Sequence, residues 1–226
     1  MIHQLFSTAI YQTKLEGWED WNETLLTKEQ YMFNPDEGRP YLTGECRDKC
    51  LMHKDEDLLP FFTEVSESIE HSLESAGIKT DMFIPYIMKS WFTIMSSSTE
   101  MTPHNHACSD LSFVYYVDPP PQSTLCFIMR ENRNKYFGGI YDVNKGDDRV
   151  LTHTPTWINS SFQQIDVAAG DLVVFPGHLD HYVPRNDTDP TIRLRSVAGD
   201  VKLMLNPDKT DLDTGLIHYT HWRKFK

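Results

Sequence analysis

Four of the ten histidines of this 226-residue chain lie in two short segments. His104 and His106 form an H-x-H pair, and His178 and His181 follow a predicted strand much later in the chain. Imidazole is the commonest protein ligand of divalent transition metals, with carboxylates next. Because residues i and i+2 of an extended segment project to the same side, His104 and His106 can bind one ion. With His181 they would form a three-point site that leaves coordination positions open.

The H-x-H pair on its own is also typical of a polar surface loop, so the distant histidine decides the interpretation. His181 follows the apolar run 172–175 and the break at Pro176-Gly177. We therefore expect it at a strand end, where it can reach the pair. His178, in the turn before it, is interpreted as part of the rim of the site.

Two arginines occupy the apolar segment TIRLRSV, residues 191–197. Arg193 and Arg195 share one face of the predicted strand, because side chains alternate with a period of two. An inward face would make a buried arginine costly unless an anion paired with it, and a carboxylate is the natural bidentate partner. An outward face would make both residues ordinary surface cations. The strand pattern does not choose between these alternatives.

The elements that must position these residues change in character near residue 80. Before it, Phe62, Val65, Ile69 and Leu73 form one stripe of a predicted helix that ends at Gly77. After it come short segments rich in Val, Ile, Tyr and Phe, bounded by Pro, Gly, Asp and Asn. Since helices do not alternate with them, the sequence predicts an antiparallel barrel or jelly roll, whose mouth can gather several strand ends.

We expect one domain over residues 1–226, mainly β with flanking α-helices. Its predicted parts are a mostly helical region (1–80), a cupin-like jelly-roll core (81–205) with an insertion (130–164), and a C-terminal tail (206–226).

Composition narrows the possible partners. The chain has 39% hydrophobic and 24% charged residues and a net charge of −12, which is typical of a soluble globular protein and argues against binding nucleic acid or an anionic membrane. It lacks a run of about 20 apolar residues and a recognisable signal peptide, so we expect an intracellular, soluble protein. Neither the oligomeric state nor the substrate is predicted.

In their order and spacing these elements resemble the iron(II)- and 2-oxoglutarate-dependent oxygenases, and most closely an uncharacterised subgroup with an H-x-H element. That resemblance implies a double-stranded β-helix, or jelly roll, with flanking helices. The segments that carry it are Gln4 to Tyr11, Ser90-Trp91, His104 to His106, Ser112 to Val117, Gly170 to Pro176, His181 and Arg193.

The resemblance implies that His104 and His181 bind iron and that Arg193 holds the distal carboxylate of 2-oxoglutarate. His106 stands where the family pattern has Asp. Three neutral imidazoles would leave iron(II) with a charge of +2, which the 2-oxoglutarate dianion brings to zero. We favour His106 as the third ligand because of its spacing from His104, with Asp110 as the alternative carboxylate.

Further residues concern the cosubstrate. Arg195 stands where the family often has Ser, and it is a second candidate for the carboxylate contact. Tyr115 and Tyr116 point to opposite faces of one strand, and the hydroxyl of the one that faces the pocket can bond a carboxylate. We take Tyr116 and Ser112 as candidate cosubstrate ligands. Phe113, where the subgroup has Gly, is expected to narrow the pocket.

The resemblance thus implies a 2-oxoglutarate-dependent dioxygenase, a hydroxylase that consumes dioxygen and acts on an unidentified small molecule or peptide. Two alternatives stand beside it. One is a cupin-type dioxygenase with three histidine ligands and no cosubstrate. The other is a non-catalytic jelly-roll protein with a binding or structural role.

Overall fold

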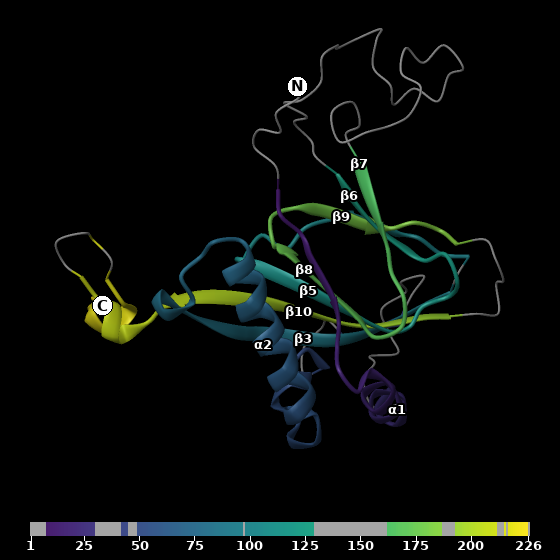
Figure 1. Cartoon of the computed structure of the whole chain (residues 1–226), viewed down its shortest axis with the longest axis horizontal. Helices are drawn as coiled ribbons and strands as arrows, with labels where there is room; N and C mark the ends of the chain where they lie inside the picture. The colour runs from purple at the N-terminus through teal and green to yellow at the C-terminus, as the bar shows by residue number, and fades with distance from the viewer. Residues whose placement is uncertain are drawn as a thin grey trace, which may run out of the picture.

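The computed structural model describes residues 8–29, 42–44, 49–96, 98–128, 162–186, 193–211, 215 and 217–225. Most of the insertion predicted over 130–164 lies outside this part of the chain. Two antiparallel sheets dominate the fold, and two helices accompany them (Figure 1). The expected mainly β jelly roll with flanking helices is therefore confirmed.

The larger sheet has six strands in the order β1 (Tyr11–Lys14), β8 (Asp171–Pro176), β5 (Leu111–Asp118), β10 (Arg193–Leu205), β3 (Phe83–Ser96) and β2 (Leu42–Thr43). The smaller has four, in the order β4 (Met101–His104), β9 (Asp180–Val183), β6 (Thr124–Ile128) and β7 (Phe162–Asp166). The region before residue 80, which we expected to be mostly helical, thus contributes β1 and β2 to the two edges of the larger sheet.

The helices are α1 (Trp18–Lys28) and α2 (Leu59–Ser75), the second of which corresponds to the helix predicted from the apolar stripe. Short 3-10 helices cover Met52–Lys54, Glu56–Leu58, Thr80–Met82, Pro207–Lys209 and Tyr219–His221. Within the described part of the chain, no helix combines the length and apolar character needed to cross a membrane.

Strand β5 is apolar on both faces because the two faces contribute to different cores. Phe113, Tyr115 and Val117 belong to the core that the larger sheet shares with α1 and α2. Tyr116 belongs to a second core between the two sheets. The Tyr115 hydroxyl donates to Asn22 Oδ1 of α1 at 2.7 Å. The structure therefore decides which tyrosine turns inward between the sheets, a choice that alternation left open.

Phe113 does not narrow the cavity between the sheets, so that prediction is wrong. Its fully buried ring lies in the helix-side core, over Gly199 of the neighbouring strand β10. A Cβ atom at Gly199 would lie 2.4 Å from the ring, so glycine is needed there because of close approach. The bulk of Phe113 fills the core and leaves the site open.

The variant Phe113→Ala should therefore lose stability and keep its metal-binding residues. We expect the free energy of unfolding to fall by about 3–5 kcal/mol, because a fully buried phenylalanine is replaced by a cavity. Chemical denaturation followed by fluorescence measures this loss. The control is Phe162→Ala at an exposed position of β7, with an expected change within about 0.5 kcal/mol. Equal effects in the two variants would contradict the assignment of Phe113 to the core.

Candidate metal centre

The three histidines that the sequence singled out come together at one end of the smaller sheet. His104, the last residue of β4, is the register partner of His181 on β9, and His106 follows in the next loop. Their candidate ligand atoms all lie within 4.8 Å of one another. Among the described residues this is the one cluster of His, Cys, Asp or Glu with the geometry of a metal site.

Each of the three imidazole rings forms a hydrogen bond through its Nδ1 atom. Nδ1 of His104 lies 2.9 Å from the carbonyl oxygen of Thr102, and Nδ1 of His181 lies 3.0 Å from that of Leu179. Nδ1 of His106 lies 2.7 Å from Oδ1 of Asp200. Because carbonyl and carboxylate oxygens only accept, each Nδ1 carries the proton and donates it. The Nδ1 proton makes Nε2 the nitrogen that bears the ring's lone pair, as in metal-binding histidines.

The environment keeps His181 in the form that a metal requires. Its side chain is buried, and this burial lowers the pKa of its imidazole to about 3. The nearby His104 and His106 lower the pKa further, while the hydrogen bond to the backbone at Leu179 opposes them. His181 is thus neutral at physiological pH, and neutral imidazole is the metal-binding species.

Backbone and side-chain contacts hold the H-x-H segment against β9. Asn105, between the two histidines, donates from Nδ2 to Oδ1 of the buried Asp180 at 2.8 Å. The backbone N–H of His106 donates to the carbonyl of Gly177 at 2.7 Å. The two segments that carry the cluster, far apart in sequence, are therefore tied together at Asn105 and at His106.

A cavity of about 330 Å³ adjoins the histidines and lies between the two sheets. The Trp91 ring stacks on His106 at 5.7 Å between centroids, with an angle of 23° between the planes. The wall combines a few hydroxyl groups with apolar side chains, from residues that include Trp91, Thr93, Val114, Tyr116, Leu125, Leu194 and Ser196.

Tyr116 lines this cavity and has an unsatisfied hydroxyl. Its side chain is fully buried, and its Oη has no hydrogen-bond partner among the described residues. Burial, with smaller contributions from Cys126 and Asp171, raises the pKa of Tyr116 well above its usual range, so the hydroxyl stays a neutral donor. A buried polar group without a partner costs about 1–3 kcal/mol, so an acceptor within reach of this hydroxyl would remove that cost.

The two candidate arginines do not reach the cavity. Leu194, Ser196 and Ala198 of β10 line it, so alternation directs Arg193 and Arg195 to the other face. Arg193 is exposed. Arg195 donates from Nε to Glu29 Oε2 at 2.8 Å and from Nη1 to Asp118 Oδ2 at 3.0 Å.

The other candidate residues also have identifiable places. Asp110 accepts from Nζ of Lys202 and from the backbone N–H of Leu203, each at 2.8 Å, and is not part of the histidine cluster. Ser112 is buried and donates to Asp200 Oδ1 at 3.2 Å, so it lies behind His106 and does not line the cavity. His178 is exposed and outside the cluster.

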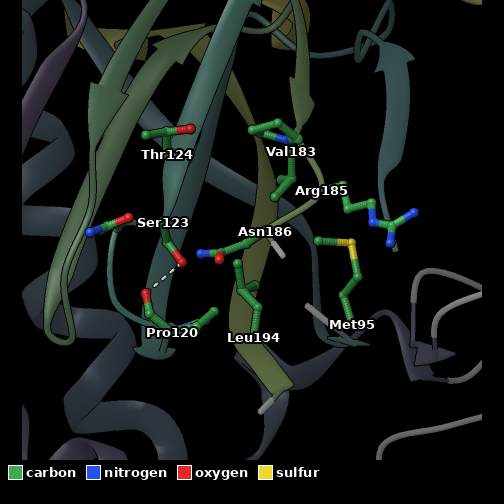
Figure 2. Close-up of a pocket in the computed structure, with 10 residues that line it drawn as sticks. Met95, Pro120, Ser123, Thr124, Val183, Arg185, Asn186 and Leu194 are labelled. Atoms are coloured by element: carbon green, nitrogen blue, oxygen red, sulfur yellow. Dashed lines mark hydrogen bonds between the residues drawn. The ribbon is translucent and has the colours of Figure 1, made fainter. Parts of the chain in front are cut away.

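A second cavity, of about 370 Å³, lies next to the first and shares Met95, Val183 and Leu194 with it. Figure 2 shows these residues with polar side chains from the ends of β6 and β9. Asn186 donates from Nδ2 to the carbonyl oxygen of Pro121 at 3.0 Å, and Ser123 donates to that of Pro120 at 2.7 Å.

Asp200 is a residue of the candidate site that sequence reasoning missed. It is only 5% exposed and bonds directly to a ligand of the candidate metal site. The one sequence feature that pointed to Asp200 is its position within an apolar strand segment. A carboxylate in such a segment is expected to have a partner, because carboxylates are rarely buried without one. This feature predicts a buried, paired carboxylate, but it does not identify the partner.

Residues 89–198 match the model of a family described as "Putative 2OG-Fe(II) oxygenase". The match spans the H-x-H pair, His181 and both arginines, and it confirms the resemblance to this superfamily. No curated protein matches the sequence.

Solved structures support the fold. The non-heme alpha ketoglutarate dependent carbocyclase SnoK of nogalamycin biosynthesis is 11% identical, with a TM-score of 0.54, covering 88% of this chain and 83% of SnoK. HygX from Streptomyces hygroscopicus, solved with nickel and 2-oxoglutarate, is 11% identical with a TM-score of 0.52, at 86% and 83% coverage. EvdO2 from Micromonospora carbonacea var. aurantiaca is 16% identical with a TM-score of 0.52, at 87% and 86% coverage.

Proposed function

We propose that this chain, which carries the 2OG-Fe(II) oxygenase family sequence over residues 89–198, binds iron(II) through His104, His106 and His181 and uses 2-oxoglutarate as its cosubstrate. The observation that carries the proposal is the convergence of the candidate ligand atoms of three histidines, within 4.8 Å of one another, beside a cavity in the jelly roll. The reaction would hydroxylate a small molecule or a peptide.

The donor set fits iron(II). Imidazole suits zinc, copper, iron and nickel, so the histidines alone do not select one metal. Three ligands on one side of an ion leave the opposite positions open, which an oxygenase requires for cosubstrate and dioxygen. The open positions would face the cavity, because Trp91, His104, His106 and His181 all line it.

The cavity also fits a carboxylate ligand. The orphan hydroxyl of Tyr116 is a donor without an acceptor, and the hydroxyl of Ser196, its register partner on β10, lines the same cavity. Three neutral imidazoles leave a divalent ion with both of its charges, which a dicarboxylate dianion balances. HygX, of the same fold, holds nickel and 2-oxoglutarate in its solved structure.

When bound, iron(II) with 2-oxoglutarate would supply the activation of dioxygen, and this chain would position the cosubstrate and exclude water. The rings of Phe175 and His181 lie 4.6 Å apart edge to face, and Phe127 packs on Phe175 at 5.2 Å. These apolar contacts exclude water from one side of His181. Tyr116 would hold the distal carboxylate, so that the cosubstrate lies in one orientation.

An anaerobic absorbance titration of metal-free protein with iron(II) and then 2-oxoglutarate tests the proposal. We expect a new visible charge-transfer band after the second addition, because chelation joins both reagents at one site. A protein that binds no iron would overturn the proposal in favour of a non-catalytic jelly-roll protein.

A second candidate is a three-histidine dioxygenase of the cupin type that needs no cosubstrate. It is favoured by the lack of an arginine among the described residues that line the cavity beside the histidines. The same titration separates the two functions, because iron binding without any spectral response to 2-oxoglutarate is the result that the second candidate predicts.

A further inference from the structure

A carboxylate lies directly behind one of the three candidate metal ligands. Asp200, on β10, is 5% exposed, and its Oδ1 is 2.7 Å from Nδ1 of His106. Ser112 donates to the same oxygen at 3.2 Å. Lys89, a partly exposed neighbour on β3, has its Nζ 3.8 Å from Oδ2.

The three histidines differ in the acceptor to which their Nδ1 atom donates. His104 and His181 donate to neutral backbone carbonyls at 2.9 and 3.0 Å. His106 donates to a carboxylate over a shorter distance, 2.7 Å. A hydrogen bond to a charged acceptor is roughly twice as strong as one between neutral groups, and it draws the ring proton toward the acceptor. The free Nε2 of His106 gains electron density as a result.

We propose that Asp200 is a positioning residue that acts through His106. It fixes the tautomer and orientation of this ring, and it makes His106 the strongest electron donor of the three ligands. It thus supplies negative charge one ring away from the metal, in a site whose direct ligands are all neutral. This inference rests on the proposed metal site.

The charges around Asp200 support this role. A buried carboxylate is costly unless it is paired. Ser112 is neutral, and Lys89 lies at the outer limit of an ion pair with a side chain that is 47% exposed. A divalent cation on the far side of His106 would be the strongest compensating charge. Asp200 would therefore attract a metal ion to the site as well as orient its ligand.

The ring of His106 is also held sterically, between Asp200 at its Nδ1 edge and the stacked ring of Trp91 on its face. Rotation of the imidazole would break the hydrogen bond and the stacking contact together. Both contacts are made within the chain and involve the Nδ1 edge and the face of the ring, so they would hold it in one orientation for an incoming ion. Preorganisation of this kind lowers the cost of binding.

Cobalt(II) is a suitable probe because its absorption spectrum reports ligand strength directly and needs no turnover. In the variant Asp200→Asn, the amide oxygen can still accept from His106 and Ser112, so the fold and the ring orientation should persist without the charge. We expect cobalt affinity to fall about 10- to 100-fold, the usual cost of losing such a support. The ligand-field bands should shift, and Asp200→Glu should restore part of the affinity.

The matched control is Asp118→Asn, which removes the same charge from a half-exposed residue paired with Arg195. Its cobalt affinity should equal that of the wild type. If Asp200→Asn and Asp118→Asn bind cobalt equally well, the inference is overturned while the metal site stands. If the wild type binds no cobalt, the proposed function itself fails.

A second measurement does not depend on the folding of any variant. In the zinc-loaded wild type, the ring N–H proton of His106 should resonate downfield of those of His104 and His181, because its hydrogen bond is short and charged. Coincident shifts for the three ring protons would also overturn the inference.

Discussion

Replacement of His181 by alanine is expected to abolish stoichiometric metal binding. This residue is the candidate ligand that comes from the second strand, opposite His104 in the register of β4 and β9. It is also the most buried of the three, at 4% exposure, so water cannot readily take its place. The remaining pair, His104 and His106, is a short chelate at the edge of the cavity and would bind an ion only weakly.

The expected effect is large because metal binding and stability are linked. At a metal concentration 100 times the dissociation constant, binding stabilises the wild type by about 2.7 kcal/mol. For a chain of this length, that corresponds to a rise of roughly 5–10 °C in melting temperature. Thermal melts of His181→Ala with and without iron(II) under anaerobic conditions should coincide.

His178→Ala is the matched control, since it removes a histidine only three positions away that is exposed and outside the cluster. It should keep the full metal-dependent rise in melting temperature. Persistence of that rise in His181→Ala would exclude this residue as a ligand. The melting temperatures of the metal-free proteins report any separate cost of removing the buried ring.

The sequence predicts the histidine cluster well, because the side-chain alternation that pairs His104 with His106 is a local property of the backbone. Residues i and i+2 share a side in extended backbone, which places His104 beside His106 without any knowledge of the fold. His181 required only the expectation that strand ends meet at the mouth of a jelly roll. The resemblance to a family then turned these separate expectations into a set of roles.

Asp200 could not be predicted in the same way, because its partner is set by strand register. On β10 it lies opposite Ser112 of β5 and Lys89 of β3, and a β-bulge follows it in the pairing with β3. That register brings it to the loop that holds His106. Side-chain alternation identifies which residues share a face of a strand, whereas the pairing of distant strands depends on the whole sheet.

The orientation of Arg193 and Arg195 could not be predicted for a similar reason. Alternation correctly groups Arg193 with Arg195, and the faces of β10 differ in what covers them. Leu194 and Ser196 turn toward the space between the sheets, while Arg195 reaches Glu29 and Asp118 on the other side. An inward and an outward face for the arginines satisfy the same sequence pattern. The outward face is selected by Glu29 and Asp118, which pair with Arg195 and are distant from it in the chain.

The absence of these arginines from the cavity gives Tyr116 a larger role, which Tyr116→Phe tests. If the hydroxyl holds the distal carboxylate of 2-oxoglutarate, its removal should weaken cosubstrate affinity by about 10- to 150-fold, since a hydrogen bond to a charged group is worth about 1.5–3 kcal/mol. Anaerobic titration of the iron-loaded protein with 2-oxoglutarate measures this affinity. Iron binding should not change, because Tyr116 is not a ligand.

The same substitution should leave the ligand-free protein equally stable or more so. In wild type the buried hydroxyl has no partner in the described structure, so folding pays the cost of removing it from water. Phenylalanine keeps the ring and removes that cost. A merely structural tyrosine would show the reverse, a loss of stability with unchanged cosubstrate affinity. Arg193→Ala completes the comparison: a loss of affinity there, with none in Tyr116→Phe, would assign the carboxylate to the arginine that the family resemblance implies.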